Sequence, residues 1–292
     1  MPRLLRRCWA RGHMRCSRMP VASPDRPSII HHFHHAGHTL TWEEHTPGSH
    51  TLLFLHGYSA NRVIWAREIA RLGHLGRCVT LDLPGHAPAT TPQGYRHLSV
   101  EELLDLELRA IAAIVGDGTA TLIGHSTGGL IALVAAARMP AQIRRVIAFS
   151  PVVWGPLSGA LGLYQCLLTL PGGYASYALL YGLTQRSRRF IQFGIGLLYS
   201  GNLRAYLRNP VADAAVRHWH PIYRQTRIRN LATLLLAIRA CDLRAEAATV
   251  RCPMLVIAGV NDPVVPVAQS RWLAEHLANV ELHALPGVGH LT

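Results

Sequence analysis

The sequence predicts an α/β protein in which a mostly parallel sheet is covered by helices on both faces. Short apolar runs alternate with segments of helical periodicity along most of the chain. Such runs are typical of strands in a parallel sheet, because helices cover both faces of the sheet and bury the strand residues on either side. The alternation stops between residues 151 and 250, which predicts a helical insertion. With 292 residues, 49% of them hydrophobic, the chain is long and apolar enough to bury a large core.

Individual elements follow from local patterns. A β-hairpin around Ala36-Gly37 is predicted over residues 29–45. Ser99 with Glu102 forms a capping box, which predicts a helix that runs to about Val115. Apolar runs predict strands, and helical periodicity predicts further helices. The strands are expected at 51–57, 78–85, 120–126, 144–150, 254–259 and 280–285, and the helices at 63–72, 128–139 and 267–277.

These elements divide the chain into a core and an insertion. The core is expected to comprise residues 29–151 and 249–292, and the helical insertion residues 152–248. Residues 1–28 are rich in arginine and lack the apolar stretch of a signal peptide, which predicts a disordered basic tail. Residues 146–185 carry no charge, but a Pro-Gly-Gly break at 171–173 favours two short apolar helices over a membrane span.

The charge and the cysteines narrow the class of protein. The formal net charge is +13 and every basic residue is arginine, yet no nucleic-acid-binding motif accompanies the charge. The six cysteines are scattered without a CxxC pair, as expected for reduced thiols in a cytoplasmic protein. No metal site is expected either, because no cysteine or carboxylate pair joins the one dense histidine cluster. That cluster comprises His31, His32, His34, His35 and His38.

The segment GHSTGG (124–129) follows a predicted strand and opens a predicted helix. A nucleophile elbow has this context: small residues on either side of a serine permit a strained turn that presents the hydroxyl above the sheet. A glycine-rich turn between a strand and a helix can also be purely structural. The strand before this segment and the helix after it favour Ser126 as a nucleophile.

A serine hydroxyl needs a base to remove its proton, and the base needs a carboxylate to orient it. Asp262 follows the predicted strand at 254–259, and His290 follows the one at 280–285. The carboxyl ends of parallel strands meet at one edge of a sheet, where Ser126 is also expected. The chain order of serine, aspartate and histidine therefore predicts a triad of Ser126, Asp262 and His290.

Other acids and histidines are weaker candidates for these roles. Asp82 also follows a strand, but it precedes Ser126 in the chain and is expected to stabilise a turn. Asp213 and Asp242 fall in the insertion with no strand before them. His125 flanks the nucleophile and is expected to pack or to form a hydrogen bond rather than to act as the base.

Catalysis by a serine also needs two N–H groups that stabilise the negative oxygen of a tetrahedral intermediate. One N–H would come from Thr127, the residue after the nucleophile. The other would come from the loop after the strand that ends at His56-Gly57, where Gly57 lets the backbone approach closely and Tyr58 is the expected donor. Taken alone, this segment could be an ordinary turn at the end of a strand. Together with GHSTGG it predicts an oxyanion hole.

Taken together, five segments resemble the α/β-hydrolase superfamily with a helical cap, in the order that the family has. They are LFLHGY (53–58), LDLPGH (81–86), GHSTGG (124–129), GVNDPVVP (259–266) and PGVGH (286–290). The resemblance covers the chain from about residue 40 onwards. It implies the α/β-hydrolase fold, the same triad, the N–H groups of Tyr58 and Thr127 as the oxyanion hole, and a cap over the substrate at about 152–248.

The sequence departs from the family in two places. Members usually have a second glycine and a serine soon after the DxPG turn, where this chain has HAPAT (86–90). Members also usually continue into a helix after the catalytic histidine, whereas this sequence ends at Thr292.

The resemblance implies a serine hydrolase that transfers the acyl group of an ester to water without a metal or an organic cofactor. The uncharged, aromatic start of the insertion predicts a small apolar substrate, with Trp154 in its pocket. The next stretch, 186–208, mixes apolar residues with arginines, which suits either a self-contained, solvated cap, the favoured interpretation, or peripheral membrane contact through the cap. No nucleic-acid partner is expected. Hydrolysis of a carbon–carbon bond, amide or thioester, and acyl transfer to another acceptor, would use the same groups. A non-catalytic hydrolase-like binding protein is the less favoured alternative.

Overall fold

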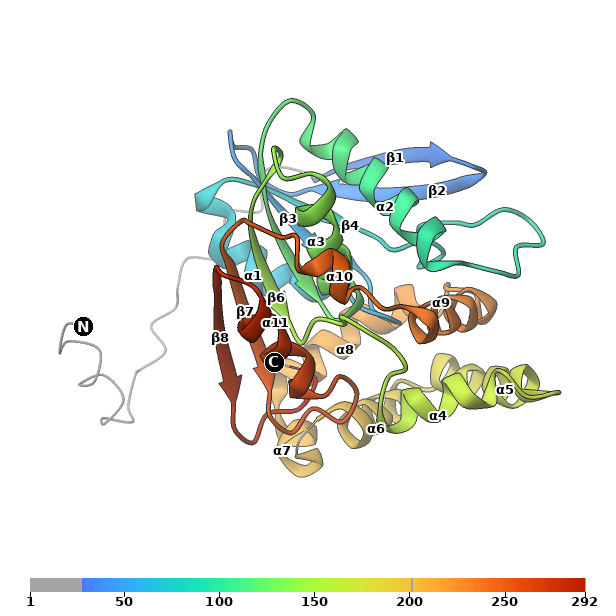
Figure 1. The fold of residues 1–292 in the computed structure, drawn as a ribbon. Coiled ribbons are helices and arrows are strands. Elements are labelled where there is room, and N and C mark those ends of the chain that lie inside the picture. The colour runs from blue at the N-terminus through green and yellow to red at the C-terminus, as the bar shows by residue number, and fades with distance from the viewer. Residues whose placement is uncertain (1–27, 201, 292) are drawn as a thin grey trace.

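The computed structural model describes residues 28–200 and 202–291, which are built around an eight-stranded sheet (Figure 1). The predicted tail of residues 1–28 lies outside the described residues except for Ser28. The strands are β1 (Ile29–His35), β2 (His38–Glu44), β3 (Thr51–Leu55), β4 (Arg77–Leu81), β5 (Ala120–His125), β6 (Ile143–Phe149), β7 (Met254–Gly259) and β8 (Val280–Leu285).

The sheet order is β1-β2-β4-β3-β5-β6-β7-β8. The hairpin of β1 and β2 pairs antiparallel at one edge, and all the pairings from β4 to β8 are parallel. The predicted mostly parallel sheet is therefore confirmed. Its parallel strands end at the same edge, and this edge carries the segments that follow β3, β5, β7 and β8.

Helices connect the strands of the core. They are η1 (Arg62–Trp65), α1 (Ala66–Leu72), η2 (Gly73–Leu75), α2 (Val100–Val115), α3 (Thr127–Arg138) and α11 (Val267–His276). The predicted start of the helix is confirmed, because the Ser99 hydroxyl oxygen accepts a hydrogen bond from the Glu102 N–H at 3.0 Å. The Glu102 carboxylate lies 3.3 Å from the His38 ring nitrogen, so the serine half of the predicted capping box is the part that forms.

The two faces of the sheet carry separate apolar clusters. The side chains of α2, α3 and α11 join one face in the main core, which includes Leu53, Leu122 and Leu273. Helix α1 covers the other face, where a smaller cluster contains Phe54 and Trp65. Successive residues of β3 point to opposite faces, and all five are buried, so this strand lies at the centre of the fold.

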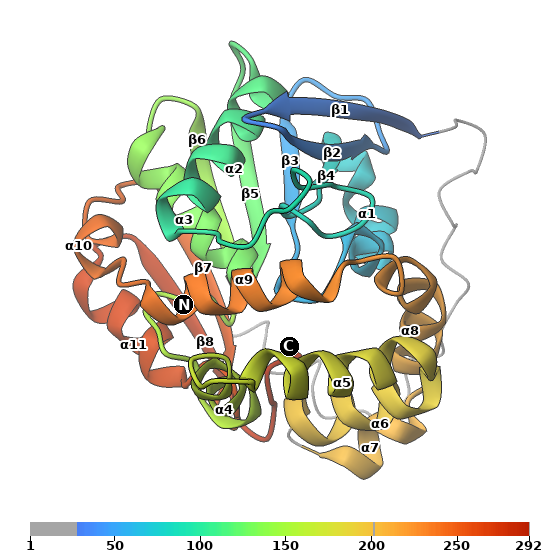
Figure 2. The ribbon, with the colours of Figure 1, turned by 90° about the vertical axis from the view of Figure 1, so that its right-hand side faces the viewer.

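Between β6 and β7 the described chain forms seven helices, here called the inserted helices. They are α4 (Gly159–Leu167), α5 (Gly173–Arg186), α6 (Arg188–Tyr199), α7 (Leu203–Arg208), α8 (Pro210–Tyr223), α9 (Ile228–Ala240) and α10 (Arg244–Ala247). Helices α4 to α7 lie at the end of the molecule opposite the β1–β2 hairpin (Figure 2). The uncharged stretch contains two short helices, α4 and α5, as predicted. No helix in the described ranges has the length and apolar character needed to cross a bilayer.

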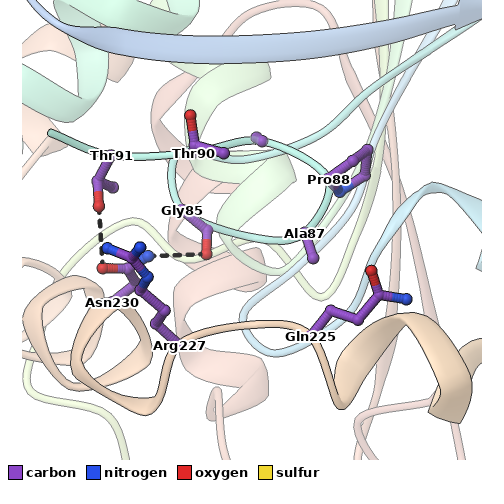
Figure 3. A pocket seen from close by; sticks show the side chains of 9 residues that line it. Gly85, Ala87, Pro88, Thr90, Thr91, Gln225, Arg227 and Asn230 are labelled. Atoms are coloured by element: carbon purple, nitrogen blue, oxygen red, sulfur yellow. Dashed lines mark hydrogen bonds between the residues drawn. The ribbon is translucent and has the colours of Figure 1, made fainter. Parts of the chain in front are cut away.

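The loop after β4 is fastened to the inserted helices, at the point where the sequence departs from the family pattern. The Asn230 side chain donates a hydrogen bond to the Gly85 carbonyl (3.1 Å) and accepts one from the Thr91 hydroxyl (3.3 Å), as Figure 3 shows. The Ala87 N–H donates to the Thr226 hydroxyl oxygen at 3.1 Å. A pocket of about 320 Å³ lies in this seam, away from Ser126. The loop is thus held by the inserted helices rather than by a second glycine of its own.

Candidate active site

Ser126 occupies a strained turn between β5 and α3. Its φ is +54°, in the left-handed region that residues other than glycine rarely adopt. The Ser126 N–H donates to the Phe149 carbonyl at 2.8 Å, which fixes the turn to the end of β6. A Cβ at Gly124 would lie 2.3 Å from the Gly128 carbonyl oxygen, so only glycine lets the strand and the helix meet this closely. The packing forces the turn and places the Ser126 side chain at the N-terminus of α3.

Asp262 and His290 are joined at the carboxyl ends of β7 and β8. The His290 Nδ1 lies 2.7 Å from the Asp262 Oδ2, and both side chains are buried. The Asp262 Oδ1 accepts hydrogen bonds from the N–H groups of Val264 and Val265 at 2.8 and 2.9 Å. Burial alone would raise the pKa of Asp262, but these three hydrogen bonds outweigh it and hold the pKa below its ordinary value. The carboxylate is therefore ionised and fixed toward the imidazole.

The backbone of His290 is held on both sides. Its N–H donates to the Tyr199 carbonyl at the end of α6 (2.8 Å). Its carbonyl accepts a hydrogen bond from the His125 Nε2 at 3.0 Å, which assigns the proton of His125 to this nitrogen. His125 thus forms a hydrogen bond, as predicted. The loop that carries His290 also packs closely against the end of β7, because a Cβ at Gly259 would lie 2.1 Å from the Gly289 carbonyl oxygen.

The rival carboxylates have other partners. Asp82 accepts the Arg62 N–H at 3.1 Å and pairs with the Arg62 guanidinium at 2.5 Å, so it fixes the start of η1 rather than its own turn. Asp242 is exposed and pairs with Arg244 at 2.6 Å. Neither contacts His290.

Ser126 and His290 line one large cavity of about 760 Å³ between the sheet edge and the inserted helices. No hydrogen bond joins the Ser126 hydroxyl to the His290 imidazole among the described residues; such bonds are often long in proteins without substrate. Most other lining side chains are apolar or aromatic. They include Ile64, Trp65, Phe149, Leu161, Leu180, Ile191, Ile195, Leu198 and Trp219. The cavity can therefore hold an apolar molecule beside the serine.

The loop after β3 approaches Ser126 closely. A Cβ at Gly57 would lie 3.0 Å from the Ser126 Cβ, so a larger residue would press on the serine. The next residue, Tyr58, lines the cavity. Within the described chain neither the Tyr58 N–H nor the Thr127 N–H donates to a protein acceptor. Two free N–H groups close to Ser126 are what an oxyanion hole requires.

Two buried histidines fix this loop, and the sequence analysis did not assign them a role. The His86 Nε2 accepts a hydrogen bond from the Ser59 N–H at 3.2 Å, and the His56 Nε2 accepts one from the Leu83 N–H at 3.1 Å. Both roles require neutral rings. Burial lowers the pKa of His56 well below its ordinary range and that of His86 to about 4. His125 is neutral for the same reason, with a pKa of about 4.

Tyrosine hydroxyl groups connect the same loop to the inserted helices. The Tyr58 hydroxyl contacts the Tyr177 hydroxyl and donates a hydrogen bond to that of Tyr181 at 2.9 Å. The rings of Tyr177 and Tyr181 stack with their centroids 4.3 Å apart. Burial raises the pKa of all three hydroxyls, so they stay neutral. In the sequence Tyr177 and Tyr181 belong only to an uncharged, aromatic stretch, and Tyr58 stands out only for its backbone N–H, because no local pattern shows which hydroxyls will meet.

Trp154 is not where the sequence analysis expected it. It does not line the cavity. The neighbouring backbone pairs with residues after α9, through Gly155 N–H to Cys241 O at 2.8 Å and Leu243 N–H to Val153 O at 2.9 Å. This pairing directs the Trp154 ring onto Trp272 of α11, with the centroids 6.2 Å apart. The predicted substrate contact of Trp154 is therefore corrected.

The histidine cluster of the hairpin has ordinary partners. His31 stacks on Trp42, His35 lies 3.1 Å from Asp105, and His38 lies 3.3 Å from Glu102. Within residues 28–200 and 202–291, no group of three or more histidine, cysteine or acidic side chains is placed to hold a metal ion. Cys78, Cys166, Cys241 and Cys252 are free thiols.

Comparison with known proteins gives consistent findings. A family model described as "Alpha/beta hydrolase family" matches residues 52–292. A curated relative from Nitrosomonas europaea, a pimeloyl-[acyl-carrier protein] methyl ester esterase, is 26% identical over 250 residues, which cover 85% of this chain and 91% of the relative.

Two solved structures share the fold at low sequence identity. A hydrolase from Pseudomonas aeruginosa PA01 superposes with a TM-score of 0.72 at 22% identity, covering 90% of this chain and 91% of that one. An enol-lactonase from Burkholderia xenovorans LB400 gives a TM-score of 0.67 at 22% identity, covering 87% and 90%.

The buried neutral histidines predict a loss of stability in acid. The pKa of His86 is about 4 in the folded chain against an ordinary value of 6.5, so the unfolded chain binds more protons between these pH values. The free energy of unfolding should therefore fall as the pH drops from 6.5 to 4, by up to about 3 kcal/mol from His86 alone. Urea unfolding should show a shallower pH dependence for His86→Gln, which keeps an acceptor for the Ser59 N–H. The exposed His74→Gln is the matched control; equal slopes for both variants would contradict the assignment.

Proposed function

Because this chain belongs to the alpha/beta hydrolase family and is an enzyme, we propose that it is a serine hydrolase that cleaves esters of apolar acids through an acyl-enzyme on Ser126. One observation carries the proposal: the strained Ser126 and the Asp262-bound His290 share a single apolar cavity. The ester specificity of the Nitrosomonas europaea relative supports the choice of an ester over other acyl derivatives.

Acylation begins with transfer of the Ser126 hydroxyl proton to the His290 Nε2 as the serine oxygen bonds to the ester carbonyl carbon. The carbonyl oxygen becomes an oxyanion and accepts hydrogen bonds from the N–H groups of Tyr58 and Thr127. The Asp262 carboxylate accepts a hydrogen bond from the His290 Nδ1–H, which selects the productive tautomer and stabilises the imidazolium.

The tetrahedral intermediate then collapses. The bond from the carbonyl carbon to the alcohol oxygen breaks, and the departing alcohol takes the proton from the His290 Nε2. Water attacks the acyl-enzyme with His290 as base, and a second collapse releases the acid and restores the Ser126 hydroxyl. Apart from the ester and water, every step uses side chains and N–H groups of the chain itself.

The neutral polar groups around the nucleophile support this assignment. His56, His86 and His125 are held uncharged and add no positive charge that would oppose a cation on His290. The ionised Asp262 is the carboxylate that stabilises this cation. We place the inserted helices over the substrate as a cap, since six tyrosines of the chain line the cavity and five of them come from these helices. The free, scattered thiols of the described residues favour the cytoplasm as its compartment.

A fluorophosphonate probe tests the nucleophile. The probe should label one residue, Ser126, because only a serine activated by a base attacks phosphorus rapidly. Ser126→Ala should abolish labelling, while Ser150→Ala, a buried serine at the end of β6, should not. Mass spectrometry of the labelled peptide identifies the site. Labelling of another serine, or none in folded protein, would remove the basis of the proposal.

Asp262→Asn should lower kcat by about 10⁴-fold. The asparagine oxygen can still accept the Val264 and Val265 N–H groups, so the fold should survive, but its amide favours the wrong imidazole tautomer. Steady-state hydrolysis of a soluble ester measures the effect, with circular dichroism as a check of folding. Asp242→Asn is the matched control, since this exposed aspartate pairs only with Arg244 within the described chain. Comparable losses in both variants would show that the acid is misassigned.

Chain length of the acyl group should control kcat/KM. Each methylene buried in the cavity contributes up to about 0.8 kcal/mol, so kcat/KM should rise from two-carbon to about six-carbon acyl esters. Rates of alkaline hydrolysis of the same esters correct for their intrinsic reactivity. A flat or falling series, or a preference for charged acids, would show that the apolar lining does not set specificity.

A further inference from the structure

The outer surface of the inserted helices exposes large apolar side chains. On α4 and α5, Leu163 is 72% exposed and Leu179 is 69% exposed, and Leu183 is 42% exposed. Leu170, between the two helices, is 59% exposed. Single exposed leucines are common, whereas large exposed apolar patches mark binding surfaces. These four come from two helices that pack together and from the turn between them. We call these four leucines the leucine patch.

The mouth of the large cavity has a similar apolar rim. Phe190, Phe193, Leu197 and Val211 line the cavity and are also 38–55% exposed, so they lie where the cavity meets solvent. The three residues on α6 follow helical spacing and share one side of the helix. The helix ends at Tyr199, whose carbonyl holds the His290 N–H. The rim is thus directly connected to the candidate active site.

Arginines occur on the same helices as both groups of apolar residues, and acids are missing from this stretch of the chain. No aspartate or glutamate occurs between residues 118 and 212. Arg186, Arg189, Arg204 and Arg208 are exposed, and none has a carboxylate within 4.0 Å among the described residues. Asp213, the next acid in the chain, is already shared by two other arginines.

All these residues belong to one end of the molecule. They lie on α4 to α7 or directly beside these helices in the chain, except Val211 at the start of α8. Figures 1 and 2 agree that α4 to α7 form the end opposite the β1–β2 hairpin. Exposed leucines, an apolar cavity mouth and arginines without a carboxylate partner in the described chain therefore belong to the same end of the molecule.

We propose that this end docks on an anionic lipid bilayer, with the leucine patch and the cavity rim in the acyl region and the four arginines at the phosphates. A bilayer matches both chemistries, because apolar side chains enter its interior while cations meet its headgroups. An acidic protein would match the arginines but would leave leucines on two adjoining helices without a comparable partner. The docking deepens the proposed function, since an apolar ester would reach Ser126 from the lipid, but the binding itself does not require catalysis.

Vesicle sedimentation with Ser126→Ala, in the full chain, tests docking apart from hydrolysis. The variant should bind vesicles of phosphatidylcholine with 30% phosphatidylglycerol and should bind pure phosphatidylcholine far more weakly. Raising the salt from 0.1 to 0.5 M should weaken binding to the anionic vesicles, because it screens the arginines. Failure of the fluorophosphonate test with vesicle binding intact would overturn the proposed function alone.

Matched variants separate the two contributions. Leu163→Ser with Leu179→Ser should lower the partition coefficient by about tenfold, whereas Leu75→Ser, a leucine of η2 that is 57% exposed, should not change it. Arg189→Gln with Arg208→Gln should lower binding to anionic vesicles by about fivefold for each arginine, and Arg71→Gln on α1 should have no effect.

Three results would overturn the docking proposal. The first is no binding to anionic vesicles. The second is binding that the leucine pair leaves unchanged, since the interaction would then be charge alone. The third is binding to soluble polyglutamate without binding to vesicles, which would indicate an acidic protein partner instead.

Discussion

The strained backbone at Ser126 is the constraint on which the rest of the site depends. Its φ of +54° persists because β3, β5 and α3 meet so closely that side chains would not fit between them. A Cβ at Gly128 would lie 2.1 Å from the Leu55 carbonyl oxygen, and one at Gly124 would lie 2.3 Å from the Gly128 carbonyl oxygen. The tight junction raises the serine side chain above the sheet edge and aims the first N–H groups of α3 at the same point.

Neutral histidines organise the surroundings of this turn. His56 and His86 connect the loops after β3 and β4, and His125 holds the carbonyl of His290. A buried charge at any of these places would be costly, and burial keeps each ring uncharged. They thus act as donors and acceptors of fixed direction, and Asp262 is left as the charged group beside His290. These hydrogen bonds hold the loops and the His290 backbone without placing a second charge beside His290.

The inserted helices complete the site as well as covering it. Tyr177 and Tyr181 hold the Tyr58 side chain, and Tyr199 holds the His290 backbone. The loop after β4 depends on Asn230 and Thr226 of the same insertion. Movement of these helices would therefore reach both the loop that carries the Tyr58 N–H and the imidazole. Their outer surface, with its leucines and arginines, is connected to the chemistry through the same contacts.

By itself the sequence determined the strands, the turn at Ser126 and the positions of Asp262 and His290 after their strands. These features are local: apolar runs, glycine spacing and residues that directly follow a strand are readable over a few positions. The tertiary structure alone decided that Trp154 packs on Trp272, that the Tyr58 hydroxyl meets two tyrosines more than a hundred residues away, and that His86 serves the loop after β3. Such contacts depend on how distant segments pack, and a tyrosine or histidine in a sequence carries no sign of the partner that packing will bring to it.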